Sequence, residues 1–250
     1  MCIINDEADV ADTQIFVAPN TNRTRQITVY ANSVQTQRIN NMMILPVPYP
    51  ETIDFIDLSK YSDMFKDLEE SFKVRSRGML SYSNDGVRPK SAGFLPVVNV
   101  GSYYATLVPD CFQLQRLNSD TFGVISPTVN SILNRYYPTL GFVVCKLRPS
   151  SAFVKYHPFA YSHTIQDSGK LFIPTRHHHH GHQEEMMSKW DHSIYSFNTQ
   201  RNCGNRELSE KVIHLHLDKI PFDMGNIIEF NKLSISGFRT NEDVQFEIAS

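Results

Sequence analysis

Short runs of apolar residues recur along the chain, and in the clearest of them apolar and polar residues alternate with the period of two of a half-buried β-strand. In the stretch 25–31, Ile27, Val29 and Ala31 would share one face of such a strand. Further strand-like runs lie at 13–18, 42–47, 97–108, 141–147, 151–156, 170–174, 193–197, 211–217, 227–238 and 244–248. The pattern therefore predicts roughly ten strands, and the run that contains Gly101 is expected to be one long strand with a bend at that glycine.

Two other segments have apolar residues at helical spacing. The first is about 60–73, and its apolar stripe consists of Tyr61, Phe65, Leu68 and Phe72. The second is 126–137, and its stripe consists of Val129, Ile132, Leu133, Tyr136 and Tyr137. Ser126 is a favoured N-cap residue and Pro127 suits the first helical position, so the second helix has a defined start.

Together these elements predict an α+β fold with about two α-helices and a mostly antiparallel or mixed β-sheet, in a single compact domain. Residues 1–250 suit one large domain, and the "RPSS" stretch at 148–151 is a candidate sub-boundary. The stretch 74–95 is rich in Ser, Gly, Pro and Arg, so it is predicted to be a loop.

Composition narrows the class of protein. The chain is 41% hydrophobic and 20% charged with a formal net charge of −2, which is typical of a globular protein and offers no basic surface for nucleic acid. No apolar run approaches the roughly 18 residues of a membrane-spanning helix. The start, "MCIINDEADVADTQ", lacks a signal-peptide pattern, so we expect a soluble intracellular protein, with secretion left open if a signal was trimmed.

The positions of the glycines and cysteines argue against two further classes of protein: nucleotide-binding proteins, and proteins with a zinc ribbon or a redox cysteine pair. None of the 11 glycines stands in a phosphate-binding or dinucleotide-binding arrangement, which argues against nucleotide chemistry. The four cysteines are too far apart in sequence for a zinc-ribbon or redox pair. The sequence indicates no particular partner, and a homo-oligomer stays open.

Histidine is concentrated in the stretch 173–195, "IPTRHHHHGHQEEMMSKWDHSIY". It holds six of the ten histidines: His177, His178, His179, His180, His182 and His192. Neutral imidazole is the commonest protein ligand for zinc and also binds copper, nickel and iron, so the stretch predicts a divalent metal site with zinc favoured. If the stretch is extended, His178, His180 and His182 share one face and are the preferred ligands; if it is helical, His178 and His182 lie one turn apart and face together.

Residues close to this set could complete the site. His192 or Asp191 is expected to be the fourth ligand, because zinc is commonly four-coordinate. In a metal-dependent hydrolase the metal would activate a bound water molecule, and Glu184, Glu185 or Asp191 would accept its proton.

Two further pairs of histidines are candidates. In a strand at 211–217, His214 and His216 would point to one face, from which they could join the metal site. His157 and His163 lie beside tyrosines, and such groups can wall a pocket.

Two other functions stay open. A non-enzymatic structural or assembly protein could place the histidine stretch at a subunit contact, where protonation near pH 6.5 would tune association. In an N-terminal cysteine hydrolase, removal of Met1 would leave Cys2 with a free α-amine that serves as base for its own thiol.

A strand, a "PVP" element at 46–48 and a helix follow one another within residues 2–72. This order, with Cys2 near the N-terminus, resembles a family of bacterial proteins of unknown function. The similarity extends over 100–147, where strand, helix and "GFVVCKL" follow in the same order. The resemblance implies an α+β core and transfers no activity.

Overall fold

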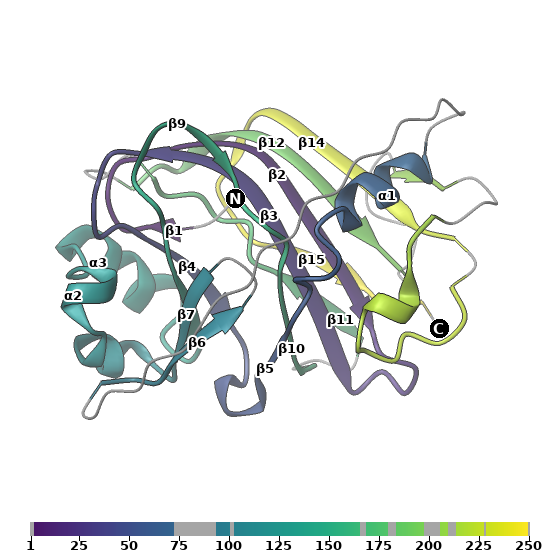
Figure 1. Cartoon of the computed structure of the whole chain (residues 1–250), viewed down its shortest axis with the longest axis horizontal. Coiled ribbons are helices and arrows are strands. Elements are labelled where there is room, and N and C mark those ends of the chain that lie inside the picture. Colours follow the sequence, from purple (N-terminus) through teal and green to yellow (C-terminus); the bar gives the residue numbers. More distant parts are fainter. Residues whose placement is uncertain are drawn as a thin grey trace.

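The computed structural model describes residues 3–72, 94–100, 103–165, 169–179, 184–197, 206–209, 214–227 and 229–249. Strands greatly outnumber helices in this part of the chain and form two large sheets and one small sheet, so the fold is α+β, as the alternating pattern predicts. Figure 1 shows the two large sheets stacked on one another, with short helices on the outside.

Sheet A has five strands, and all of its pairs are antiparallel. Its order is β1 (Ile3–Ile4), β4 (Met42–Val47), β8 (Gly141–Lys146), β7 (Tyr103–Val108) and β6 (Val97–Val100). Both faces of β4 and β8 are buried, which explains why their sequences, MMILPV and GFVVCK, are continuous apolar runs.

Sheet B has eight strands. Its order is β13 (Arg206–Leu208), β14 (Asn231–Thr240), β12 (Met187–Ser196), β2 (Asp9–Pro19), β3 (Arg25–Thr36), β10 (Phe159–Thr164) and β5 (Asp54–Ile56), and β9 (Ser150–Lys155) also pairs with β3. Among the described strands, β2 and β12 are the one parallel pair. Sheet C consists of β11 (Lys170–Ile173) and β15 (Val244–Glu247), paired antiparallel.

The described residues contain three α-helices: α1 (Met64–Glu70), α2 (Ser119–Phe122) and α3 (Pro127–Tyr136). α1 and α3 fall inside the two predicted helical segments, whereas α2 is a single turn with no periodic signal. α3 begins as expected, because the Oγ of Ser126 accepts a hydrogen bond from the N–H of Val129 at 3.2 Å. None of these helices is long and apolar enough to cross a bilayer. Short 3₁₀ turns lie at Pro50–Thr52, Cys111–Arg116 and Leu217–Lys219.

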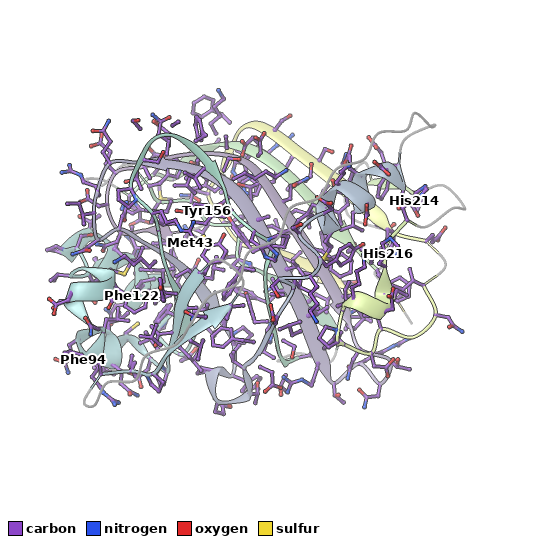
Figure 2. All side chains as sticks on the ribbon, viewed as in Figure 1. Met43, Phe94, Phe122, Tyr156, His214 and His216 are labelled. Atoms are coloured by element: carbon purple, nitrogen blue, oxygen red, sulfur yellow. The ribbon has the colours of Figure 1, made fainter. Side chains whose placement is uncertain are left out.

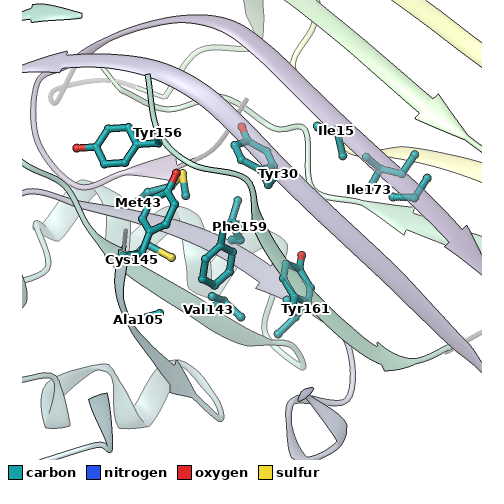
Figure 3. Packing of buried hydrophobic residues seen from close by; sticks show 14 of the residues in the cluster. Ile15, Tyr30, Met43, Ala105, Val143, Cys145, Tyr156, Phe159, Tyr161 and Ile173 are labelled. Atoms are coloured by element: carbon teal, nitrogen blue, oxygen red, sulfur yellow. The ribbon is translucent and has the colours of Figure 1, made fainter. Parts of the chain in front are cut away.

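The main core lies between sheets A and B. Figure 3 shows side chains meeting there from both sides, including Met43, Ala105, Val143, Cys145, Ile15, Tyr30, Phe159 and Tyr161. Tyr103 stacks on Tyr156 with ring centroids 5.0 Å apart, and its edge meets Phe159 at 5.3 Å. Complete burial of such a large side chain stabilises the fold by about 1.5–3 kcal/mol.

Helices cover the outer faces of the two large sheets. α2 and α3 pack on sheet A, and the predicted stripe residues Ile132 and Leu133 are 3% and 0% exposed. α1 packs on sheet B through Phe65 and Leu68, which are buried as predicted. Tyr136 was expected to be buried too, but it is only half-buried.

An ion pair fastens the end of α1 to sheet B. Lys232 Nζ lies 2.8 and 3.0 Å from the two carboxylate oxygens of Glu69, and the hydroxyl of Tyr195 donates to the same carboxylate at 2.5 Å. Burial raises the pKa of Tyr195, so its hydroxyl remains a donor. α1 is therefore held by polar contacts as well as by its apolar face.

Some sequence predictions are wrong in detail. The run at 97–108 is not one long strand. It contains two strands, β6 and β7, that pair antiparallel with Val97 opposite Thr106. Residues 214–217 belong to no strand, and Leu215 instead packs into the core beneath α1. The strand expected from residue 227 begins at Asn231.

Two predictions concern the connections between elements, at 148–151 and at 74–95. At 148–151 the chain passes from β8 in sheet A to β9 in sheet B, and the two sheets share one core. The loop predicted at 74–95 lies outside the described residues except for its last two positions.

Candidate functional site

Within the histidine stretch, the segment His177–His179 runs beside β1 and the residues that follow it. Ile4 N donates to the carbonyl oxygen of His178 at 2.6 Å, and Ala8 N donates to that of His179 at 2.9 Å. The three histidines are only 2%, 4% and 9% exposed. This part of the stretch is therefore an inner segment of the fold, with its backbone paired to the N-terminal residues.

Asn241, which follows β14, holds the same segment from the other side. Its Oδ1 accepts a hydrogen bond from His177 N at 2.6 Å, and its Nδ2 donates to the carbonyl oxygens of His177 and Glu185 at 2.8 and 2.7 Å. Asn241 and His177 are 3% and 2% exposed, so the two hydrogen bonds between them are shielded from water. One amide thus positions the backbone at both ends of the segment 178–184.

Asp243 fixes the backbone of the two residues before the histidines. Its Oδ1 accepts from the backbone N–H groups of Thr175 and Arg176 at 2.8 and 3.0 Å, and its Oδ2 accepts from the Tyr137 hydroxyl at 2.6 Å. Burial raises the pKa of Tyr137, which keeps this hydroxyl protonated. Sequence reasoning missed Asn241 and Asp243, and the available signal was the turn-forming "TNED" between two strands.

Three aromatic rings form what we call the buried histidine cluster: His177, Trp190 and His192. The ring centroids of His177 and His192 lie 4.9 Å apart with an interplanar angle of 29°. Trp190 lies 4.8 Å from His177 and 4.7 Å from His192. Alternation along β12 places Trp190 and His192 on its buried face, where His177 covers them.

In and beside the cluster, some buried polar atoms have no hydrogen-bond partners among the described residues: both ring nitrogens of His177, Nε1 of Trp190 and, on the neighbouring strand, Oγ1 of Thr13. Thr13 is the register partner of His192 in the neighbouring strand β2. Burial lowers the pKa of His177 to about 2, so its ring is neutral and keeps one nitrogen lone pair. A buried polar group that lacks a partner costs about 1–3 kcal/mol, so the cluster has unused capacity to bind a polar atom.

Asp191 has a structural task beside the cluster. Its Oδ2 accepts from Asp12 N at 2.9 Å, where β2 carries a bulge and Asp12 adopts a φ of +52°. Its Oδ1 lies 3.8 Å from Nδ1 of His192, and burial raises the pKa of Asp191. The carboxylate therefore stabilises an unusual backbone conformation next to His192.

Glu184 and Glu185, the other acidic candidates, are both engaged elsewhere. Glu184 accepts a hydrogen bond from the Tyr136 hydroxyl and pairs with Arg135 at 3.1 Å, which ties it to the end of α3. This bond raises the pKa of Tyr136 and explains why Tyr136 is not buried under its own helix. Glu185 accepts from the Ser188 hydroxyl at 3.2 Å and is exposed.

His214 and His216 do not join the buried histidine cluster. Figure 2 shows both at the α1 end of the molecule, whereas β1, which pairs with His178, lies toward the other end in Figure 1. His214 N bonds to Ser71 Oγ at 3.1 Å and His216 N to the Tyr61 hydroxyl at 2.8 Å. The structure thus places them under α1.

The remaining candidates Cys2, His180 and His182 lie outside the described residues. Within the described residues, no group of three or more His, Cys, Asp or Glu side chains could hold a metal ion. The stacked rings of His177 and His192 turn their faces to each other, whereas metal ligation requires their nitrogen lone pairs to converge.

His163 lines a separate pocket of about 330 Å³ with Gln26, Lys170 and Phe172. Its Nδ1 lies 2.8 Å from the carbonyl oxygen of Thr164, so Nδ1 carries the proton. Burial lowers the pKa of His163 to about 4. His163 is therefore a neutral core histidine with a satisfied donor.

Comparisons with known proteins identify the fold. No model of a protein family matches the chain, and no curated protein matches its sequence. The crystal structure of baculovirus P35 is similar over 100% of this chain and 100% of that chain, with a TM-score of 0.52 and 10% sequence identity. A mutated baculovirus P35 after caspase cleavage aligns over 95% of this chain and 100% of its own, with a TM-score of 0.47 and 10% identity. The chain therefore shares the fold of P35.

Proposed function

We propose that this chain is a protease-directed binding protein, which a caspase cleaves and which remains bound as an inhibitor. The observation that carries the proposal is the fold shared with baculovirus P35 along the whole of both chains. Caspase cleavage is described for a mutated form of P35. A fold alone supports many functions, so the proposal also needs support from this chain's own residues.

Asp85 is the residue that we assign as the cleavage position. Caspases are cysteine proteases that cut peptide bonds after aspartate. The segment 73–93, between α1 and β6 in sequence, contains one acidic residue, Asp85, and Gly86 follows it. This is the one Asp-Gly pair in the chain, and glycine places no side chain beside the scissile bond. The segment lies outside the described residues, so the assignment rests on sequence.

The topology supports inhibition over simple degradation. A cut after Asp85 would separate β1 to β5 and α1 from all later elements. These two parts are interleaved, because β4 pairs with β8, β2 with β12, and β3 with β10. They also share the core between sheets A and B. The cleaved protein would therefore stay assembled and could keep its new end in the protease cleft.

An inhibition assay tests this proposal. A purified effector caspase is incubated with a molar excess of the chain, and its residual activity is followed with a fluorogenic peptide that ends in aspartate. We expect activity to fall in proportion to the added chain. Asp85→Ala should remain uncut and leave the caspase active.

Asp167→Ala is the matched control, because Asp167 is the other aspartate outside the described residues. This variant should inhibit as well as the unchanged protein. Inhibition by Asp85→Ala equal to that of the unchanged protein, or no inhibition by either, would contradict the proposal.

A metal-binding function is the second candidate, and the ring nitrogens of His177, which have no partner among the described residues, favour it. His177 is 2% exposed, and neither of its ring nitrogens has a partner among the described residues. A zinc ion held by His177 or His192 with further ligands from the histidine stretch would satisfy this group. A hydrolase would require in addition an open coordination position for water.

Metal analysis separates this candidate from the first. The untagged protein, purified without a nickel column, should contain near-stoichiometric zinc or another transition metal if the candidate is correct. His177→Ala with His192→Ala should then remove the metal, whereas His214→Ala with His216→Ala should retain it. Metal-free protein that still inhibits a caspase would leave only the first function.

A further inference from the structure

β14 forms the margin of sheet B over most of its length. It pairs with β12 at ten register positions, from Thr240 opposite Met187 to Asn231 opposite Ser196. On its other side, β13 reaches only Asn231 to Leu233. Within the described part of the chain, Ser234–Thr240 therefore has a strand neighbour on one side alone, and β14 is seen beside β12 at the margin in Figure 1.

A pocket of about 560 Å³ opens next to this margin. Its apolar wall consists of Trp190, Leu233, Ile235, Val244 and Phe246. Its polar residues are Ser234, Arg239, Thr240, Glu242 and Gln245. Both its volume and its mixture of apolar walls with a few polar groups suit a ligand side chain.

Trp190 lacks cover from β14. Its register partner is Gly237, which has no side chain, and no atom lies within 4 Å of the position where one would begin. The indole Nε1 of Trp190 is buried and has no acceptor among the described residues. Trp190 is 3% exposed, so it contributes a small apolar part of the pocket wall, and its Nε1 faces the interior of the protein.

Arg239 supplies a charge at the same place. Within the described residues, the hydrogen bond of its side chain runs from Nε to the carbonyl oxygen of Ser236, at 3.1 Å. No described carboxylate pairs with its guanidinium, whose remaining N–H groups suit a carboxylate.

The opposite face of the same margin is mostly polar and carries two exposed apolar side chains. Phe238 is 75% exposed, and Met187, on the neighbouring strand, is 51% exposed. An unpaired strand with exposed apolar residues is a template for another strand. Side chains of an added strand would alternate between the pocket and the surface around Phe238.

We propose that Ser234–Thr240 is a docking edge for an extended, apolar and acidic peptide segment of a partner protein. The segment adds as a strand beside β14, its backbone amides pair with the side of Ser234–Thr240 that has no described strand neighbour, and one apolar side chain enters the pocket beside Gly237. A carboxylate two residues along binds Arg239. This mode of recognition is β-strand addition, and it is independent of the cleavage proposed at Asp85.

A direct test uses the full-length protein and the blocked peptide Thr-Val-Thr-Leu-Thr-Asp-Thr. Its second, fourth and sixth side chains form the apolar and acidic face. Trp190 is the single tryptophan of the chain, so its fluorescence reports on the pocket wall itself. We expect a saturable change in Trp190 emission with a Kd below about 1 mM.

Two variants and a modified peptide make the test specific. Arg239→Glu should weaken binding about tenfold or more and should prefer a peptide with lysine in place of aspartate. Lys189→Glu is the matched control: it makes the same charge reversal on β12, opposite Phe238 on the exposed face, and should leave binding unchanged. N-methylation of alternate peptide amides should abolish binding for one set of amides and spare the other.

Three results would overturn the proposal. The first is the absence of saturable binding, and the second is equal binding by Arg239→Glu. The third is concentration-dependent dimerisation of the free protein, lost in Phe238→Lys, which would make a second copy of the chain the occupant of this edge.

Discussion

Asn241→Ala should lower the free energy of unfolding by about 2–4 kcal/mol. The native amide makes three hydrogen bonds, two with the backbone of His177 and one with the carbonyl oxygen of Glu185. The two backbone groups of His177 are buried, so alanine leaves both without partners at about 1–2 kcal/mol each. The carbonyl of the exposed Glu185 can bind water instead and adds little.

Denaturant unfolding followed by Trp190 fluorescence measures this change. Trp190 lies 4.8 Å from the ring of His177, so its native-state emission should also shift when His177 loses its anchor. Asn134→Ala is the matched control, because Asn134 is exposed and its amide bonds only to Asn130 within the described residues. The control should change stability by less than about 0.5 kcal/mol. A loss below about 1 kcal/mol for Asn241→Ala, with unchanged native emission, would refute the reasoning.

Two further predictions concern packing and pH. Leu133→Ala should cost about 2–5 kcal/mol in the same unfolding assay, because Leu133 is 0% exposed between α3 and sheet A; a loss under about 0.5 kcal/mol would mean that the packing is misassigned. The folded state keeps His163 neutral down to about pH 4, whereas the unfolded chain protonates it near pH 6.5. Protonation of His163 therefore favours the unfolded state between about pH 6.5 and pH 4. The free energy of unfolding should fall by about 3 kcal/mol as the pH drops through this range. His163→Asn should remove that part of the pH dependence, and identical pH profiles for both proteins would contradict the assignment.

Local periodicity was sufficient to predict most strands and the two longer helices. The alternation at 25–31 predicted β3, and the cap at Ser126 predicted the start of α3, since both signals act within a few residues. β10 gave no such signal, because five of its six residues are buried and its two faces have no polar contrast. The run at 211–217 alternates, yet its described residues form a loop that packs beneath α1.

The arrangement of the described histidines depends on residues that are distant in sequence. The prediction that His178, His180 and His182 share one face stays a prediction, because His180 and His182 lie outside the described residues. The structure stacks His177 on His192 through contacts from elsewhere in the chain. Asn241, 64 residues after His177, fixes that backbone. No local pattern encodes such a contact, so only the fold could reveal it.

Cleavage by a caspase at Asp85, without separation of the two fragments, can be tested directly. The full-length protein is incubated with a purified caspase and then analysed by gel filtration and by intact mass spectrometry. We predict two fragments, one ending at Asp85 and one beginning at Gly86, that elute together at the size of the uncut protein. An uncut chain, a cut at another aspartate, or two fragments that elute separately would contradict the account.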